Sequence, residues 1–204
     1  MRLLRASFVL LALSAATIVG AAEDAESWAK RTIDQGFAIL RDNSGGDEGR
    51  RAGFRTFIAD HVEARKSALF ALGVYRRGAN PAVLEEYAAV FTDYSIEIYE
   101  SRLSDYKDAT LTVTGSIENK PGDITVNTRG EAPKLREPVR IAFRLQSDGG
   151  TYKITDIQVE GIWLSIELRD EFNALLGANG GDIQALTRTL IARTNNLRAG
   201  SSES

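Results

Sequence analysis

Residues 151–172 read TYKITDIQVEGIWLSIELRDEF, and the rest of the chain can be placed relative to this stretch. In its first half, apolar residues stand two apart in two pairs: Tyr152 and Ile154, then Ile157 and Val159. This spacing predicts a strand, and the change of phase between the pairs predicts a β-bulge. In its second half, apolar residues recur at helical spacing: Leu164, Leu168, Phe172, Leu175 and Leu176. The stretch therefore predicts a strand that turns at residues 160–161 into a helix covering the same core.

The composition of the chain excludes several kinds of chemistry. Its 204 residues are 43% hydrophobic and 26% charged, which is ordinary for one globular domain. It contains no cysteine, so disulfides, thiolate nucleophiles and cysteine-ligated metals are impossible. His61 is the single histidine, which leaves a histidine metal site or a catalytic triad poorly supplied.

Residues 1–22 have the pattern of a secretory signal peptide. Arg2 and Arg5 precede an apolar run, residues 8–19, and small residues follow at 20–22. The run is short for a membrane span, although an uncleaved anchor is the alternative. We expect cleavage near Ala22, which would leave a soluble exported protein. Without Arg2 and Arg5, 23 basic residues stand against 28 acidic ones, a net charge of −5 that does not indicate a nucleic-acid partner.

The first half of the exported chain predicts helices. Residues 23–42 form an amphipathic pattern, and after a turn-rich linker a second helix places apolar residues inward: Phe54, Phe57, Ile58 and Val62. Residues 62–75 are helical and increasingly apolar, and Gly73 within them indicates close packing or a helix end. Asn80 and Pro81 then begin a long helix, running to about residue 106, with one apolar stripe: Leu84, Tyr87, Ala88, Phe91, Tyr94 and Ile98.

From residue 109 the period of the pattern changes from helical to alternating. Residues 110–117, 122–128 and 139–145 alternate apolar with polar side chains, and Asp148-Gly149-Gly150 predicts a hairpin turn into the next strand. This pattern is typical of an antiparallel meander with one wet face, and with the flanking helices it predicts an α+β fold. Asp182 is expected to cap a short last helix, and residues 195–204 are expected to be a disordered tail.

Isolated polar residues offer only weak candidate sites. His61 on a helix is most simply structural or solvent-facing. Asp156, Glu160 and Glu167 lie near the strand–helix corner, but a hydrolase that works with paired carboxylates needs two of them to face one cavity, which sequence does not show. Arg76 and Arg77 could meet an anionic head group, or they could form a solvated helix end.

Two blocks, residues 62–106 and residues 138–172, resemble the MlaC (toluene-tolerance) family of periplasmic lipid-carrying proteins. The matching features share order and spacing rather than one specific motif: Leu72-Gly73 before Tyr75, Pro81 before Tyr87 and Phe91, Tyr99, Tyr106, Pro138-Val139-Arg140, Asp156, Val159-Glu160-Gly161, Arg169 and Phe172. The resemblance implies one lipid-binding domain over residues 23–194, with a bent antiparallel sheet of four to five strands clasped by helices. An apolar cavity is expected between the sheet and the helices.

The resemblance also implies a function. It indicates a periplasmic carrier that shuttles phospholipid between the inner and outer membranes and maintains outer-membrane lipid asymmetry. The implied partners are an inner-membrane ABC transporter complex with a lipid-binding ring and an outer-membrane lipoprotein complex. No catalysis and no cofactor are expected, only phospholipid as cargo. A hopanoid-associated branch of the family, an exported enzyme and a protein-binding adaptor are the alternatives.

The residues expected to contact lipid come from the apolar faces of the helices and strands: Leu69, Leu72, Tyr75, Phe91, Tyr94, Ile98, Val139, Ile141, Phe143, Ile154, Ile157, Val159, Trp163, Leu164 and Phe172. Val139, Ile141 and Phe143 should point inward, because they alternate with Arg140 and Arg144, which must stay wet. Relatives in the family usually have a small residue where Trp163 stands. We therefore expect the Trp163 ring to narrow the cavity.

Overall fold

The computed structural model of the chain describes residues 23–42, 44–104 and 106–201. The predicted signal peptide and its cleavage site lie outside these residues. The described part contains six α-helices, one 3₁₀-helix and a five-stranded sheet, so the predicted α+β class is confirmed. Among the described residues, no helix combines the length and hydropathy needed to cross a membrane.

The sheet is an open antiparallel meander in the order β1-β2-β3-β4-β5. Its strands have these bounds: β1 Thr110–Lys120, β2 Asp123–Glu131, β3 Val139–Asp148, β4 Thr151–Val159 and β5 Ile162–Trp163. The hairpin between β3 and β4 turns at Gly149 and Gly150, whose φ angles of 57° and 93° require the freedom of glycine. The alternating pattern therefore predicted this part of the fold correctly.

The predicted β-bulge is present in β4. Arg144 of β3 pairs with Asp156, whereas its neighbour Leu145 pairs with Ile154, so Thr155 is an extra residue in the ladder. This extra residue brings both apolar pairs of β4 toward the same side of the sheet. The corner at residues 160–161 differs from the prediction, because the chain makes a further hairpin into the two-residue strand β5 before the helix begins.

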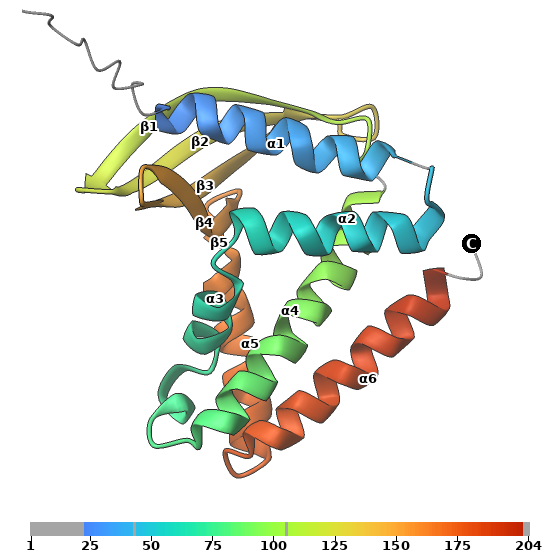
Figure 1. The fold of residues 1–204 in the computed structure, drawn as a ribbon, viewed down its shortest axis with the longest axis vertical. Coiled ribbons are helices and arrows are strands. Elements are labelled where there is room, and N and C mark those ends of the chain that lie inside the picture. Colours follow the sequence, from blue (N-terminus) through green and yellow to red (C-terminus); the bar gives the residue numbers. More distant parts are fainter. Residues whose placement is uncertain (1–22, 43, 105, 202–204) are drawn as a thin grey trace, which may run out of the picture.

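The helices cover the sheet and form the other end of the molecule (Figure 1). Their bounds are α1 Ala25–Arg41, α2 Gly46–His61, α3 Ala64–Ala71, η1 Gly73–Arg76, α4 Pro81–Ser104, α5 Leu164–Ala178 and α6 Ile183–Ser201. Side-chain caps fix three helix starts: Asp24 accepts from the Ser27 backbone N–H at 2.9 Å, and Asn80 and Asp182 cap α4 and α6 in the same way. The predicted starts at Asn80-Pro81 and Asp182 are therefore correct.

The last helix is longer than the sequence predicts. Residues 195–201, for which we expected a disordered tail, continue α6 to Ser201. Leu197 packs against the buried helical core, and the Arg198 guanidinium lies 2.8 Å from the carboxylate of Glu97 on α4. These two tertiary contacts, which no local pattern reveals, hold a polar segment in helical form.

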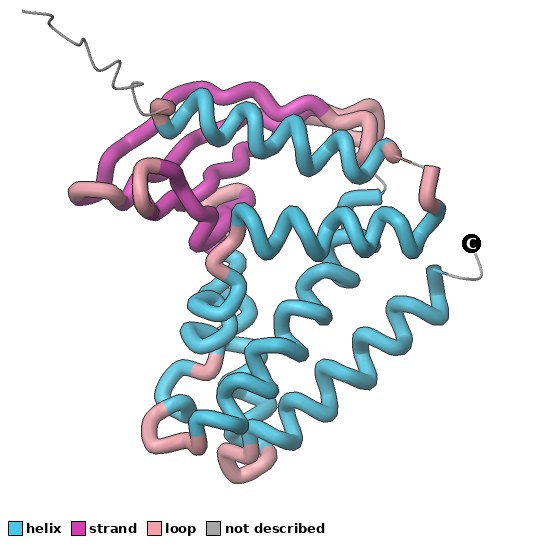
Figure 2. Tube along the Cα trace, viewed as in Figure 1, coloured by secondary structure: helices cyan, strands magenta, loops and turns pink. Residues whose placement is uncertain are grey.

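The buried apolar residues form three clusters. Buried residues of α3, α4, α5 and α6 form a helical core, and α1 packs on the sheet to form a second core around Trp28 and Leu145. A third, smaller cluster joins α1, α2 and α4 through Leu40, Phe54 and Ile96. Figure 2 shows the strands gathered at one end, with α1 across them and α2 between α1 and the remaining helices. The space between sheet and helices is therefore enclosed by several independent elements.

Candidate functional site

A cavity of about 520 Å³ lies between the sheet and the helices. Its wall draws on α1, α2, α3, α4, α5 and strands β1 to β4, so residues from most of the chain converge on it. Apolar side chains dominate the wall. A cavity of this size and character is typical of small-molecule and lipid sites.

The sheet supplies one wall of the cavity. Val139, Ile141 and Phe143 line it from β3, while the neighbouring arginines Arg140 and Arg144 are not part of the wall. Arg140 pairs with Glu160 at 2.9 Å, and Arg144 pairs with Asp123 at 2.7 Å. The inward face that we expected for this strand is thus the face that lines the cavity. Because of the bulge, β4 adds residues from both of its pairs: Ile154, Ile157 and Val159.

The helices supply the opposite wall. Phe91 and Ile96 come from α4, and Leu164 and Leu168 come from the first turns of α5. Two small residues of α3, Ala64 and Ala71, also line the cavity and leave room beside the sheet. The N-terminal helices α1 and α2 close one side with large apolar residues: Ile33, Phe37, Leu40, Phe54, Phe57 and Ile58.

The cavity brings together part of the set of residues expected to contact lipid. Those lining it are Phe91, Val139, Ile141, Phe143, Ile154, Ile157, Val159 and Leu164. Six others belong instead to the helical core or pack against it: Leu69, Leu72, Tyr75, Tyr94, Ile98 and Phe172. A helical apolar stripe looks the same whether it faces packed side chains or an open cavity, which is why periodicity did not separate the two groups.

Trp163 lies outside the cavity wall. It is half-buried in β5 and paired with Gln158. The expectation assumed that the strand leads directly into the helix. The extra hairpin instead places this ring in an edge strand of the sheet.

Sequence reasoning missed the contribution of α1 and α2. The helical spacing placed Phe54 and Phe57 on the inward face of α2, but no pattern distinguished a cavity wall from packed core there or at Phe37 of α1. Tyr99, Leu111 and Leu168 also line the cavity, although the sequence did not predict them as lipid contacts. The clustering of aromatics on the helices is a signal that could have found Phe37, Phe54, Phe57 and Tyr99, whereas no comparable signal marks Leu111 and Leu168.

Polar groups in the wall are largely occupied by other protein groups. Asp156 accepts hydrogen bonds from the backbone N–H groups of Ile157 and Ser165, at 2.9 and 3.1 Å, and from the Ser165 hydroxyl. The other carboxylate of the wall, Glu131, accepts from Arg129 at 2.9 Å. These bonds leave the wall suited to apolar contact rather than to proton transfer.

The remaining candidates lie outside the cavity wall. Glu160 binds Arg140, whose backbone N–H it accepts at 2.6 Å, and Glu167 is exposed on α5. The His61 ring packs against Trp28 and Phe57 with centroids 5.9 and 4.9 Å away, and burial lowers the pKa of His61. Within the part of the chain that the structure describes, no group of three or more His, Asp or Glu residues could hold a metal ion.

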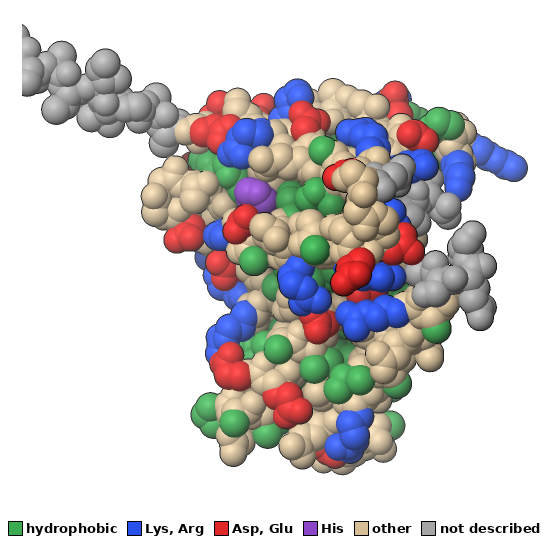
Figure 3. Space-filling model, turned by 45° about the vertical axis from the view of Figure 1, so that its right-hand side comes forward, with side chains coloured by type: hydrophobic (Ala, Val, Ile, Leu, Met, Phe, Trp, Pro, Cys, Tyr) green, Lys and Arg blue, Asp and Glu red, His purple; other side chains and the backbone are tan. Residues whose placement is uncertain are grey.

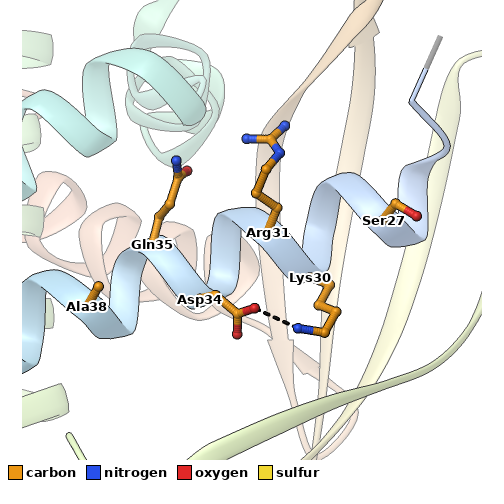
Figure 4. A pocket seen from close by; sticks show the side chains of 6 residues that line it. All are labelled: Ser27, Lys30, Arg31, Asp34, Gln35 and Ala38. Atoms are coloured by element: carbon orange, nitrogen blue, oxygen red, sulfur yellow. Dashed lines mark hydrogen bonds and ion pairs between the residues drawn. The ribbon is translucent and has the colours of Figure 1, made fainter. Parts of the chain in front are cut away.

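A shallow depression on the exposed face of α1 carries no comparable features (Figure 4). The charged side chains that border it are already paired. Lys30 Nζ lies 2.7 Å from Asp34 Oδ2, and Arg31 donates to Glu23 at 2.6 Å. This surface is therefore a solvated helix face.

The fold and the cavity together define a small α+β protein whose interior is held open between a sheet and a layer of helices. A family model described as MlaC protein matches residues 30–192, and the chain belongs to the MlaC family. A similar solved structure is that of the phospholipid-binding protein from Ralstonia solanacearum, in complex with a phospholipid at 1.53 Å. It is 22% identical in sequence with a TM-score of 0.75, and the match covers 86% of this chain and 99% of that protein.

Proposed function

We propose that the protein is a periplasmic phospholipid carrier without catalytic activity. The observation that carries the proposal is the apolar cavity of about 520 Å³ between sheet and helices. Membership of the MlaC family and the phospholipid bound by the similar Ralstonia protein support this assignment. The acyl chains occupy the space between β3, β4 and the facing helices, and the head group remains near solvent.

The energetics suit a carrier. Each methylene removed from water is worth about 0.8 kcal/mol, so one ~16-carbon chain gains about 13 kcal/mol on leaving water. A bilayer offers nearly the same gain, so transfer between bilayer and cavity is close to balanced. Balanced transfer permits both loading and release at membranes.

We further propose that the carrier moves phospholipid between the two membranes and so maintains outer-membrane asymmetry. Its partners are an inner-membrane ABC transporter complex and an outer-membrane lipoprotein complex, as the family implies. An exported enzyme is the less favoured alternative, because Asp156 and Glu131, the carboxylates of the wall, are already engaged by donors.

Organic extraction of the purified protein, followed by mass spectrometry, tests the proposal. We expect a phospholipid at about one molecule per protein. A hopanoid at that stoichiometry would retain the carrier function and change its cargo. A protein that carries no lipid, and takes none from phospholipid vesicles, would refute the proposal.

A further inference from the structure

The attachment of α2 differs from that of the other helices around the cavity. α2 contributes Phe54, Phe57 and Ile58 to the wall, but Phe54 is its only buried residue. By contrast, α4, α5 and α6 are joined through the large buried core between them. Moving α2 away from the cavity therefore exposes less packed apolar surface than moving any of those helices.

Ion pairs supply much of the contact between α2 and α4. Three arginines of α2 face three carboxylates of α4 in the opposite order along the chain, and we call this set the arginine ladder: Arg50, Arg51 and Arg55 with Glu100, Glu97 and Asp93. The Arg50–Glu100 and Arg51–Glu97 distances are 3.2 and 3.1 Å. Figure 3 shows hydrophobic side chains at the surface beside the histidine, with acidic and basic side chains gathered lower on the same face.

The two ends of α2 are held unequally. At the C-terminal end, the Glu63 N–H donates to Ile154 of β4 at 2.9 Å, and Lys153 donates to the Asp60 carbonyl at 2.6 Å. At the N-terminal end, Gly45 provides no side-chain cap, and Gly46 has a φ of +59°. The helix is therefore fixed to β4 at its C-terminal end, whereas its N-terminal end is joined to α1 through residues 42–45 and is held against α4 by the ladder.

The contact with α1 is close and is made at glycines. A Cβ atom at Gly53 would lie 3.1 Å from Ile39 Cγ2, and one at Gly36 would lie 3.5 Å from the Phe57 ring. At both positions a side chain of one helix fits into the space beside a glycine of the other. Phe54, in the small cluster with Leu40 and Ile96, is the one buried residue that packs α2 against α1 and α4.

We propose that α2 is the lid of the cavity: its N-terminal end swings outward about the attachment to β4, and the arginine ladder latches it closed. The movement of α2 does not depend on the proposed function. Only the identity of the ligand that enters, a phospholipid, rests on that function. Opening removes the wall formed by Phe54, Phe57 and Ile58, which gives a lipid a lateral entrance between α1 and α4. Because the Arg55–Asp93 pair is exposed, its contribution to the latch falls with rising salt, whereas the pairs of the buried Glu97 and Glu100 are screened much less.

Hydrogen exchange of the full exported chain tests the lid without any lipid. We expect the backbone amides of α2 to exchange faster than those of α4 and α6. The double variant Arg50→Gln/Arg51→Gln should accelerate exchange in α2 by about tenfold, because it removes two partly buried ion pairs. The matched control is Arg65→Gln, which removes the Arg65–Glu85 pair between α3 and α4 and should leave α2 unchanged.

A disulfide staple tests whether lid opening admits lipid. The chain has no cysteine, so Ile39→Cys/Gly53→Cys introduces a single possible cross-link, at positions where a Cβ atom on residue 53 would lie 3.1 Å from Ile39 Cγ2. The oxidised variant should take up fluorescent phosphatidylethanolamine from phosphatidylcholine vesicles at least about tenfold more slowly than its reduced form, and the ladder variant should take it up faster than wild type.

The outcomes separate the lid from the proposed function. If α2 exchanges together with α4 and α6 in wild type and in the ladder variant, or if the oxidised staple loads as fast as the reduced form, the lid is overturned. If wild type takes up no phospholipid while α2 exchange responds to the ladder variant, the lid stands and the carrier function is refuted.

Discussion

Ile141 and Leu145 lie four residues apart on one face of β3, yet their surroundings differ. Ile141 is half-buried and lines the cavity, whereas Leu145 is completely buried in the core between α1 and the sheet. A carboxylate at position 141 can be solvated by water entering an empty cavity, but one at position 145 cannot. The fold should therefore tolerate an aspartate at position 141 and be strongly destabilised by one at position 145.

We expect Ile141→Asp to fold and to lose its co-purifying lipid. Leu145→Asp, the matched control on the same strand, should lose several kcal/mol of stability or fail to fold. Circular dichroism, thermal melting and lipid extraction measure these effects. If Ile141→Asp unfolds like the control, this part of the sheet is ordinary core; if it folds and keeps its lipid, the cavity lies elsewhere.

Asp123 provides a pH-dependent contribution to stability. Its buried carboxylate accepts from Arg144 Nε and Nη2 at 2.9 and 2.7 Å, and this bonding lowers the pKa of Asp123. A carboxyl group whose pKa is lower in the folded state stabilises the fold above its unfolded pKa of about 3.9. That stabilisation is lost as the pH falls through the folded pKa.

Asp123→Asn should therefore lower the free energy of unfolding by about 1.5–3 kcal/mol at neutral pH. The difference from wild type should persist down to about pH 4 and shrink in stronger acid. Urea unfolding of both proteins at pH 7 and pH 3 measures it. An equal difference at the two pH values would show that the ion pair is not its source.

At the scale of elements, the periodicity of the sequence located strands and helix starts, but it did not show which tertiary neighbours each apolar face contacts. The change from helical to alternating spacing located the strands, and Asn80-Pro81 and Asp182 located helix starts, because caps and alternation act within a few residues. The stripe of α4 was harder, since Phe91 faces the cavity while Tyr94 faces packed helices. The β5 hairpin also escaped prediction, because Glu160 adopts a left-handed φ of 46° that glycine usually provides.

The C-terminal turns of α6 depend on contacts with distant residues. Truncation after Asn195 removes Leu197 from the edge of the helical core and Arg198 from the buried Glu97 carboxylate. We expect a loss of about 2–4 kcal/mol in the free energy of unfolding, because a buried charge then loses one of its partners. Denaturant titration measures the loss, and deletion of residues 202–204 alone is the control. Unchanged stability would show that these turns are dispensable.

At the scale of the molecule, the cavity lies between two packed bodies. The helical core and the core between α1 and the sheet are each filled with large side chains. The cavity between them leaves wall atoms without contacts on one side, which a fully packed interior would supply. A bound lipid is therefore expected to complete the packing and to stabilise the folded state.

We predict that removing the lipid lowers the melting temperature. A ligand that binds only the folded state stabilises it by about 2.7 kcal/mol when present at 100 times its Kd. For a domain of this size, ~2.7 kcal/mol corresponds to a shift of about 5–10 °C. Calorimetry of the protein as purified, after delipidation, and after reloading from phospholipid vesicles measures the shift and its reversal. Ile141→Asp is the control, because a fold that no longer holds lipid should melt at one temperature in all three states. Identical melting of delipidated and reloaded wild type would show that phospholipid does not occupy the interior.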